Sequence, residues 1–303
     1  MTGVESRPAR ASFREATARR RLAAVLDPGS FREILPPSER VTSPHLAALD
    51  QPVAFDDGAI VGEGLLGGQK VFAAAQEGAF LGGAVGEVHG AKLAGLLSRA
   101  ERERPAGVLL LLDSGGVRLQ EANAGLLAVS EVMRAVLSAR SSGVPVVALI
   151  GGGWGCFGGM GIVARCCDAV ALSEEGRLGI TGPEVLETTK GVEELDASDR
   201  ALVWRTYGGK HRYLLGEADR LVEDDVAAFR AAALDLLGRR REVGLGALDA
   251  AHRRLAARLF ELGACADATE VWARAGVPEP ARLPVLEVGE FLRAVASARR
   301  GEP

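Results

Sequence analysis

Apolar residues in the central part of the chain form two patterns, one with intervals of three and four residues and one of continuous runs. Intervals of three and four residues place one set of side chains on a helix face. They occur twice, at Leu93, Leu96, Leu97 and Ala100 and at Leu119, Ala122, Leu126, Val129, Met133 and Val136. Largely apolar runs at 107–112, 144–150 and 168–172 predict buried strands. Strands and helices therefore alternate, which predicts an α/β fold with much parallel pairing.

The regions on either side of this core have weaker patterns. Residues 1–50 predict an amphipathic helix and a proline-containing connector, and the glycine-rich stretch 58–88 predicts short strands joined by sharp turns. Beyond about residue 184 we expect mainly helix, with the last helix at 248–260 and a frayed tail after 297. Three parts are predicted: a helix and connector at 1–50, a main domain at 51–240, and a helical segment packed on it at 241–303.

The composition is that of an ordinary globular protein. The net charge is −4, with 48% hydrophobic and 25% charged residues. This charge gives no drive toward nucleic acid, and no apolar stretch approaches the roughly 20 residues of a membrane span. We therefore expect a cytoplasmic protein with neither nucleic acid nor membrane as a partner.

A basic run stands near the N-terminus, at Arg7, Arg10, Arg14, Arg19, Arg20 and Arg21. It predicts a solvated helix face, and the intervening Glu5 and Glu15 disfavour a mitochondrial presequence. The four cysteines are Cys156, Cys166, Cys167 and Cys265. Because they include no C-x-x-C pair, we expect buried thiols and no metal site.

Glycines follow two successive predicted strands. Asp113-Ser114-Gly115-Gly116-Val117 follows the first strand, and 151–161 follows the second. At a helix start, backbone N–H groups lack intrahelical partners and can point at an incoming oxygen. Two such donors on one carbonyl form an oxyanion hole, where each contributes roughly 3 kcal/mol. One cluster alone indicates a tight turn, but two at successive strand ends favour an oxyanion hole.

Residues 153–158 also match the G-x-G-x-x-G pattern of dinucleotide-binding turns, with Glu174 and Glu175 after the next strand. Such a turn needs a full helix in the crossover to that strand. The next predicted strand begins at 168, which leaves room for only a short helix. We therefore do not favour a nicotinamide cofactor.

Phrases in a preserved order resemble the carboxyltransferase subunits of acyl-CoA carboxylases. They are 27–31 (D-P-G-S-F), 80–86 (F-M-G-G-S-M-G in that family), 113–121 (D-S-G-G-A-R-x-Q-E), 157–159 (T-G-G) and 182–185 (G-P-R-V). Within this superfamily the chain looks closest to β subunits of biotin-independent malonate decarboxylases, through 83–92, 197–206 and 208–213. It lacks the zinc ribbon of the acetyl-CoA carboxylase β chain, and Glu184 replaces an expected arginine.

The resemblance implies a crotonase (ClpP-like) superhelix of repeated ββα units. It implies that the Val117 N–H is the first oxyanion donor, with Gly115 and Gly116 shaping the approach, and that Gly158 or Gly159 supplies the second. A malonyl thioester carried by an acyl carrier protein would lose CO₂, leaving an enolate that these donors stabilise. Protonation would then give the acetyl thioester.

The resemblance also implies partners. These are a homologous γ subunit that completes the active site, an acyl carrier protein subunit with a CoA-like prosthetic arm, and an acyl-carrier/CoA transferase subunit. No cofactor is expected on this chain itself. The apolar helices after residue 184 are candidates for the interface with the γ subunit.

Three basic residues are candidates for the carrier's phosphates or an acidic partner, namely Lys210, His211 and Arg212. A solvated loop explains the same cluster equally well. By residue type, His89 and His211 are candidate proton donors. For His89, at the start of a predicted helix, capping or packing is the favoured interpretation.

Other reactions stay open on the sequence alone. One is carboxyl transfer from a malonyl thioester to a biotin protein. Another is enoyl-CoA hydration or isomerisation, which usually needs a pair of glutamates, although only Glu121 lies near either glycine cluster. A non-catalytic scaffold chain is the third.

Overall fold

A computed structural model gives the fold of residues 11–299. Its centre is one seven-stranded sheet with the strands in sequential order. The strands are β1 (Arg32–Ile34), β2 (Ala59–Leu66), β3 (Gln69–Gln76), β4 (Gly107–Leu112), β5 (Val146–Ile150), β6 (Ala169–Ser173) and β7 (Arg220–Val222). The first three pair antiparallel, and β3 to β7 pair parallel. The parallel pairing expected from the buried apolar runs is confirmed.

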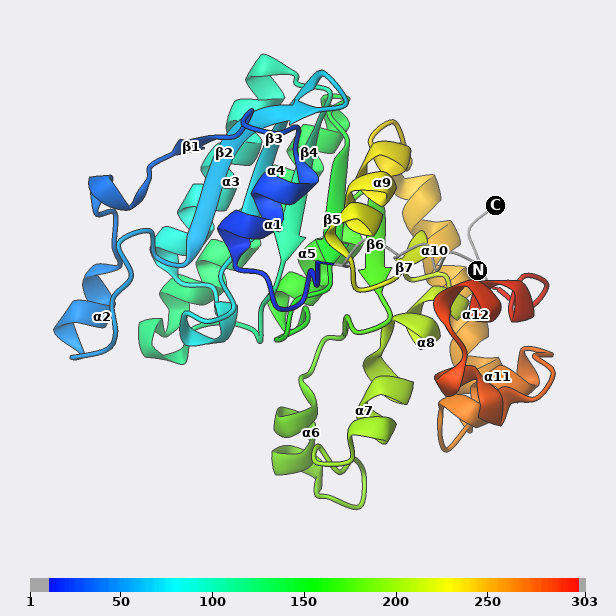
Figure 1. Cartoon of the computed structure of the whole chain (residues 1–303). Coiled ribbons are helices and arrows are strands. Elements are labelled where there is room, and N and C mark those ends of the chain that lie inside the picture. The colour runs from blue at the N-terminus through cyan, green and yellow to red at the C-terminus, as the bar shows by residue number, and fades with distance from the viewer. Residues whose placement is uncertain (1–10, 300–303) are drawn as a thin grey trace, which may run out of the picture.

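Helices cover both faces of this sheet (Figure 1). On one face lie α3 (Glu87–Glu103), α4 (Asn123–Ser141) and α5 (Gly159–Cys166); on the other lie α1 (Ala18–Val25) and α9 (Val226–Leu236). Alternate side chains of β4 enter the two cores, with Leu110 packed toward α3 and α4 and Leu109 toward α1 and α9. A strand buried on both faces has to be apolar throughout.

A second, short extended segment follows each of the strands β3, β4, β5 and β6. Isolated parallel bridges join Val85 to Val117, Ser114 to Cys156, and Cys156 to Leu178. The chain after β4 and after β5 therefore makes one more extended stretch, beside the next such stretch, before it enters a helix. This is the repeated ββα unit, and it confirms the superhelical α/β fold expected from the sequence.

The remaining elements are short, except for α10 with 18 residues. They are α2 (Pro44–Ala48), α6 (Pro183–Lys190), α7 (Arg200–Tyr207), α8 (Gly209–Leu214), α10 (Leu245–Leu262), α11 (Ala268–Arg274), α12 (Val288–Ala294), and the 3₁₀ turns Pro37–Glu39, Leu81–Gly83, Leu119–Glu121 and Pro280–Val285. The helix expected at 248–260 is α10, but it is not the last, because α11 and α12 follow. Helices of seven residues contain too few turns to show a periodic pattern.

The helix predicted from residue 119 begins later than expected. Leu119 lies in a 3₁₀ turn and is 89% exposed, and Leu126 is 58% exposed. The buried face of α4 carries smaller residues, including Ala128, because α3 approaches closely: a Cβ on Gly90 would lie 2.5 Å from the Ala128 Cβ. The prediction was therefore wrong for Leu119 and Leu126, whereas Val129 and Val136 lie on the buried face of α4 as predicted.

The N-terminal arm packs on the sheet. Phe13 stacks on Phe229 of α9 with ring centroids 3.8 Å apart, and β1 extends the sheet within the predicted connector. The solvated helix face is wrong for Arg21, which is 3% exposed and bound to Asp113. Arg7 and Arg10 lie outside the described residues. The division at 50 and 240 stays a prediction.

Candidate functional site

The first glycine turn, 113–118, is tied to its surroundings by backbone hydrogen bonds. Gly115 N–H donates to Gly82 O at 2.9 Å. Val85 N–H donates to Gly116 O, and Arg118 N–H donates to Val85 O, both at 3.0 Å. Both neighbours of Val117 thus bond toward Val85, and the alternation of an extended strand turns the Val117 N–H the other way. That N–H has no acceptor within residues 11–299.

A buried ionic network holds the end of this turn. The Arg118 side chain is 1% exposed and donates to Asp57 Oδ2 at 2.8 Å and to Glu121 Oε1 at 3.0 Å. It also donates to the carbonyls of Ala84 and Asp57. Glu121 in turn accepts the Glu87 N–H at the start of α3. Arg118 lies within 113–121, one of the phrases that resemble the carboxyltransferases, but no role was predicted for it. The arginine directly after a glycine turn, with a glutamate three residues later, could have indicated this ion pair.

Asp113 ties the two glycine turns together. One carboxylate oxygen accepts from Arg21 and the other from the Trp154 N–H, each at 2.8 Å. Burial raises the pKa of Asp113, although the nearby Arg21 guanidinium opposes that shift. A Cβ on Gly152 would lie 2.0 Å from the Asp113 carboxyl carbon, so only glycine fits there.

The second glycine turn, 151–159, lies beside the first. Ser114 N–H donates to Gly155 O at 2.7 Å, and Phe157 N–H donates to Ser114 O at 2.8 Å. A Cβ on Gly158 would lie 3.1 Å from Gly116 Cα, so the two turns almost touch. Gly158 has φ +59 and ψ −138, a conformation that favours glycine.

The contacts distinguish Gly158 from Gly159 as a donor. The Gly158 N–H already donates to Ile180 O at 2.9 Å. Gly159 is the first residue of α5, where an N–H has no intrahelical partner, and it has no acceptor within residues 11–299. The geometry therefore favours Gly159, together with Val117, as the pair of backbone donors. An oxyanion hole needs two such groups beside each other.

Glu121 and His89, two titratable side chains near the first turn, are not placed for proton transfer. Burial alone would raise the pKa of Glu121, but hydrogen bonds from the Glu87 N–H and Arg118 outweigh it and lower the pKa. His89 is fully buried beside Gln76, and burial lowers its pKa to about 3. His89 thus packs in the core, as favoured from the sequence, and the arrangement of Glu121 does not support hydratase chemistry.

The predicted basic cluster makes contacts within the chain. Lys210 Nζ donates to Pro284 O at 2.9 Å and Leu286 O at 2.6 Å. Arg212 donates to Glu217 and to a carbonyl, while His211 accepts from the Trp272 indole, and burial lowers its pKa to about 3. The role in phosphate binding stays a prediction that these contacts do not favour.

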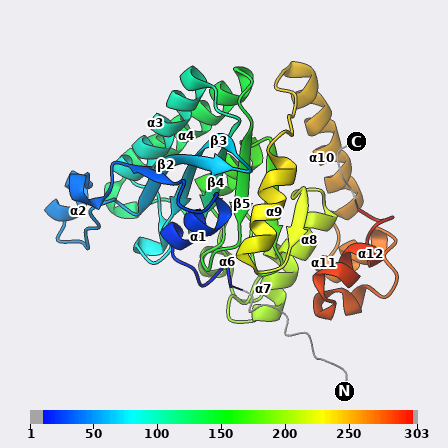
Figure 2. The ribbon, with the colours of Figure 1, turned by 45° about the horizontal axis from the view of Figure 1, so that its top comes forward.

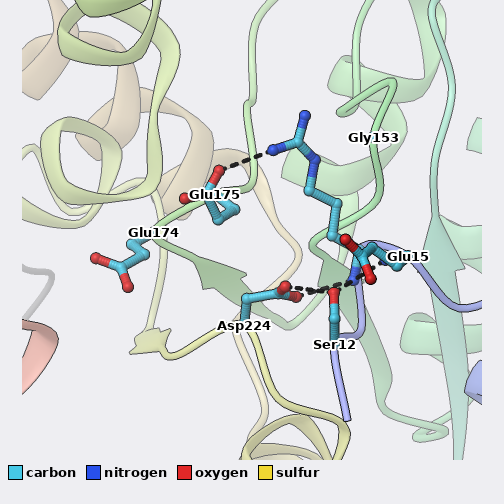
Figure 3. A pocket seen from close by; sticks show the side chains of 7 residues that line it. Ser12, Glu15, Gly153, Glu174, Glu175 and Asp224 are labelled. Atoms are coloured by element: carbon cyan, nitrogen blue, oxygen red, sulfur yellow. Dashed lines mark hydrogen bonds and ion pairs between the residues drawn. The ribbon is translucent and has the colours of Figure 1, made fainter. Parts of the chain in front are cut away.

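An acidic hollow of about 640 Å³ lies near the second turn (Figure 3). Its side chains include Glu174, Glu175 and Asp224, with Arg14 bound to Glu175 at 2.9 Å. A malonyl carboxylate would be repelled there, so this hollow is not the candidate site.

Within residues 11–299 no group of three or more histidine, cysteine or acidic side chains is arranged to hold a metal. Cys156 and Cys167 are buried, whereas Cys166 and Cys265 are only partly covered. No helix in this part of the chain is long and apolar enough to span a bilayer.

The ββα superhelix with two adjoining glycine turns defines a crotonase-type fold. The family model for the carboxyl transferase domain matches residues 14–234, and the chain belongs to this family. It is 40% identical to the malonyl-S-ACP:biotin-protein carboxyltransferase MADC of Malonomonas rubra, over 95% of this chain and 96% of that protein.

Solved structures agree with this assignment. A Pseudomonas malonate decarboxylase hetero-tetramer in complex with malonate contains a similar chain, at 42% identity and a TM-score of 0.81, covering 88% of this chain and 98% of that one. A Pseudomonas malonate decarboxylase MdcD–MdcE hetero-dimer matches at 40% identity and a TM-score of 0.66, over 81% of this chain and 96% of that one.

Proposed function

We propose that this chain is the β subunit of a malonate decarboxylase and acts on a malonyl thioester carried by an acyl carrier protein. One observation carries the proposal beyond family membership: the Val117 and Gly159 N–H groups lie on adjoining turns, and neither has an acceptor within residues 11–299. Two backbone donors so arranged suit the oxygen of a thioester that gains negative charge.

The proposed reaction breaks the bond between the α-carbon and the carboxylate. CO₂ leaves, and the electron pair of that bond delocalises into the thioester carbonyl as an enolate. Val117 and Gly159 donate hydrogen bonds to the enolate oxygen, and a proton added to the α-carbon gives the acetyl thioester. The only prosthetic group in this scheme is the CoA-like arm of the carrier.

A homologous γ subunit is the proposed partner at this site. Leu119, Leu126 and Leu127 are each more than half exposed beside the first turn. Apolar residues that cluster on a surface commonly mark a protein interface. The two Pseudomonas malonate decarboxylase structures are hetero-oligomers, which supports a partner subunit. Carrier and acyl-carrier/CoA transferase subunits complete the proposed complex.

Carboxyl transfer to a biotin protein is the second candidate. The supporting observation is the name of the Malonomonas relative, which aligns along almost the whole chain. Both reactions begin with the same enolate, so they differ in what receives the carboxyl group.

CO₂ release from malonyl thioester by the purified complex, with avidin added, separates the two. Release that resists avidin and falls at least about 100-fold in Gly159→Val supports decarboxylation at these turns. Release that requires a biotin protein supports transfer instead. Release that is unaffected in Gly159→Val contradicts the site.

A further inference from the structure

One buried guanidinium joins the N-terminal arm to the start of the first glycine turn. It belongs to Arg21 of α1, the helix that lies against the sheet near α9 (Figures 1 and 2). Its Nη1 donates to Asp113 Oδ2 at 2.8 Å, while Nε and Nη2 donate to the carbonyls of Phe13 and Arg14 at 2.7 and 2.9 Å. Because a guanidinium is a rigid fork of donors, these contacts fix the arm and the carboxylate relative to each other.

The other oxygen of the Asp113 carboxylate reaches the second turn. Asp113 Oδ1 accepts the Trp154 N–H at 2.8 Å. A Cβ on Gly152 would lie 2.0 Å from the Asp113 carboxyl carbon, so the carboxylate lies directly against the backbone of this turn. Asp113 is itself the first residue of the first turn. It therefore sets the spacing of the two turns, one through its backbone and the other through its side chain.

The two proposed donors follow Asp113 and the second turn closely along the chain. Val117 lies in the same turn as Asp113, and Gly159 begins the helix that the second turn enters. Ser114 N–H donates to Gly155 O at 2.7 Å, so the two segments run side by side before they reach the donors. A shift of one segment against the other would change the separation of the two N–H groups. Misplacement by about 1 Å can lower a rate by roughly 100-fold.

The position of the carboxylate depends on the charge of Arg21. The Arg21 and Asp113 side chains are only 4% and 3% exposed. Burial raises the pKa of Asp113, and the Arg21 guanidinium opposes that rise. A buried carboxylate that loses its cation takes up a proton or moves toward water, because burial disfavours its charged form. Loss of the guanidinium is therefore expected to weaken the contact with the Trp154 N–H.

We propose that Arg21 is a positioning residue for the reaction at the two turns. It acts through Asp113, whose carboxylate sets the separation of the Val117 and Gly159 N–H groups. The inference rests on the proposed function and deepens it, because it makes the N-terminal arm part of the structure that places the oxyanion donors. A substitution at Arg21 should therefore slow the reaction without weakening the binding of substrate.

The first test is CO₂ release from malonyl thioester by the complex of this chain with its partner subunit. Arg21→Met is expected to lower kcat at least about 30-fold and leave KM within about threefold, because the donors act on charge that develops in the transition state. Arg230→Met is the matched control, since it removes an ion pair with Asp27, just beyond the other end of α1. This control should leave kcat unchanged. An unchanged kcat in Arg21→Met, or an equal loss in both variants, would overturn the inference.

Rescue distinguishes positioning from support of the fold. In Arg21→Met/Asp113→Asn the side chain at 113 carries no charge, and its amide oxygen still accepts the Trp154 N–H. The double variant should therefore recover at least about tenfold of the kcat that Arg21→Met loses. If Arg21 only stabilised the arm, the second substitution would add to the loss, which would overturn the inference. Should Arg21→Met yield no folded complex, the double variant decides: a kcat within about tenfold of the unsubstituted value supports the inference, and a larger loss contradicts it.

Hydrogen exchange separates this inference from the proposed function. The Trp154 amide should exchange at least about tenfold faster in Arg21→Met and slow again in the double variant. An unchanged rate in Arg21→Met would contradict the inference whatever reaction the complex performs. Absence of CO₂ release from the unsubstituted complex, with the expected exchange rates, would contradict the proposed function and leave Arg21 as the residue that positions the turns.

Discussion

The two glycine turns adjoin each other but are held in different ways. The first ends in Arg118, whose buried guanidinium joins Asp57 and Glu121. The second contains no charged residue of its own and is bound to Asp113 of the first; its Gly151, Gly152 and Gly159 lie where Phe229, Asp113 and Val129 leave no room for a Cβ. One turn is therefore positioned by charge and the other by close packing. Removal of a charge should damage the first turn, and addition of an atom should damage the second.

The largest effect is expected from Arg118→Met. The substitution leaves Asp57 and Glu121 buried without their cation, which typically lowers the free energy of unfolding by about 3–5 kcal/mol. Urea unfolding of the complex measures it. Arg134→Met, which removes an ion pair with Glu131 at a side chain 61% exposed, should change stability by less than about 1 kcal/mol. Equal losses in both variants would show that charge does not hold the first turn.

Gly159→Ala should have an intermediate effect. The new Cβ would lie 2.3 Å from Val129 Cγ1, and overpacking of this kind usually lowers stability by about 1–3 kcal/mol. It should also displace the proposed donor and reduce CO₂ release by about 100-fold.

Val129→Ala supplies the matched test of that prediction. Added to Gly159→Ala, it removes the clash, so the two stability losses should sum to more than the loss in the double variant. If the stability losses of the two single variants add up to that of the double variant, the contact with Val129 is not what makes alanine unfavourable at position 159.

The last effect, which appears only on acidification, concerns His89, which donates its backbone N–H to Asp57 in the network of the first turn. Burial lowers its pKa to about 3. Below about pH 6.5 the histidine is protonated in the unfolded chain, whereas in the folded chain it stays neutral down to about pH 3. The free energy of unfolding therefore decreases as the pH falls, by up to about 1.4 kcal/mol per pH unit. His89→Gln should remove this contribution from unfolding measured between pH 7 and 5.

His252→Gln, on the exposed face of α10, is the control for that slope. The slope should be the same in this variant as in the unsubstituted protein. A slope that His89→Gln leaves unchanged would assign the acid sensitivity to other groups, of which His211 is the first to examine.

The sheet was the most predictable part of the molecule. The apolar run 107–112 has the same bounds as β4, because a strand buried on both faces allows no polar residue. The adjacency of the two turns was also predictable, since parallel strands present their carboxyl ends at one edge. The choice between Gly158 and Gly159 was not, because it depends on the backbone angles of Gly158 and on a bond to Ile180.

Partners distant in the sequence explain the remaining errors. Arg21 and Asp113 are 92 residues apart, and Lys210 reaches a carbonyl 76 residues away. Local pattern shows that such a residue is charged but not which group it meets. Leu126 of α4 was misplaced for a related reason: a periodic pattern gives the spacing of a face, and only the neighbouring helix decides how far that face is covered.

The contact of Phe13 and α1 with α9 also affects how the chain is made. The N-terminal arm leaves the ribosome first, but α9 ends only at Leu236. At roughly 5–20 residues per second, the apolar side of α1 stays uncovered for about 10–40 s of synthesis. The nascent chain presents to chaperones a surface that the finished protein hides, and a product truncated before α9 should be degraded rather than accumulate.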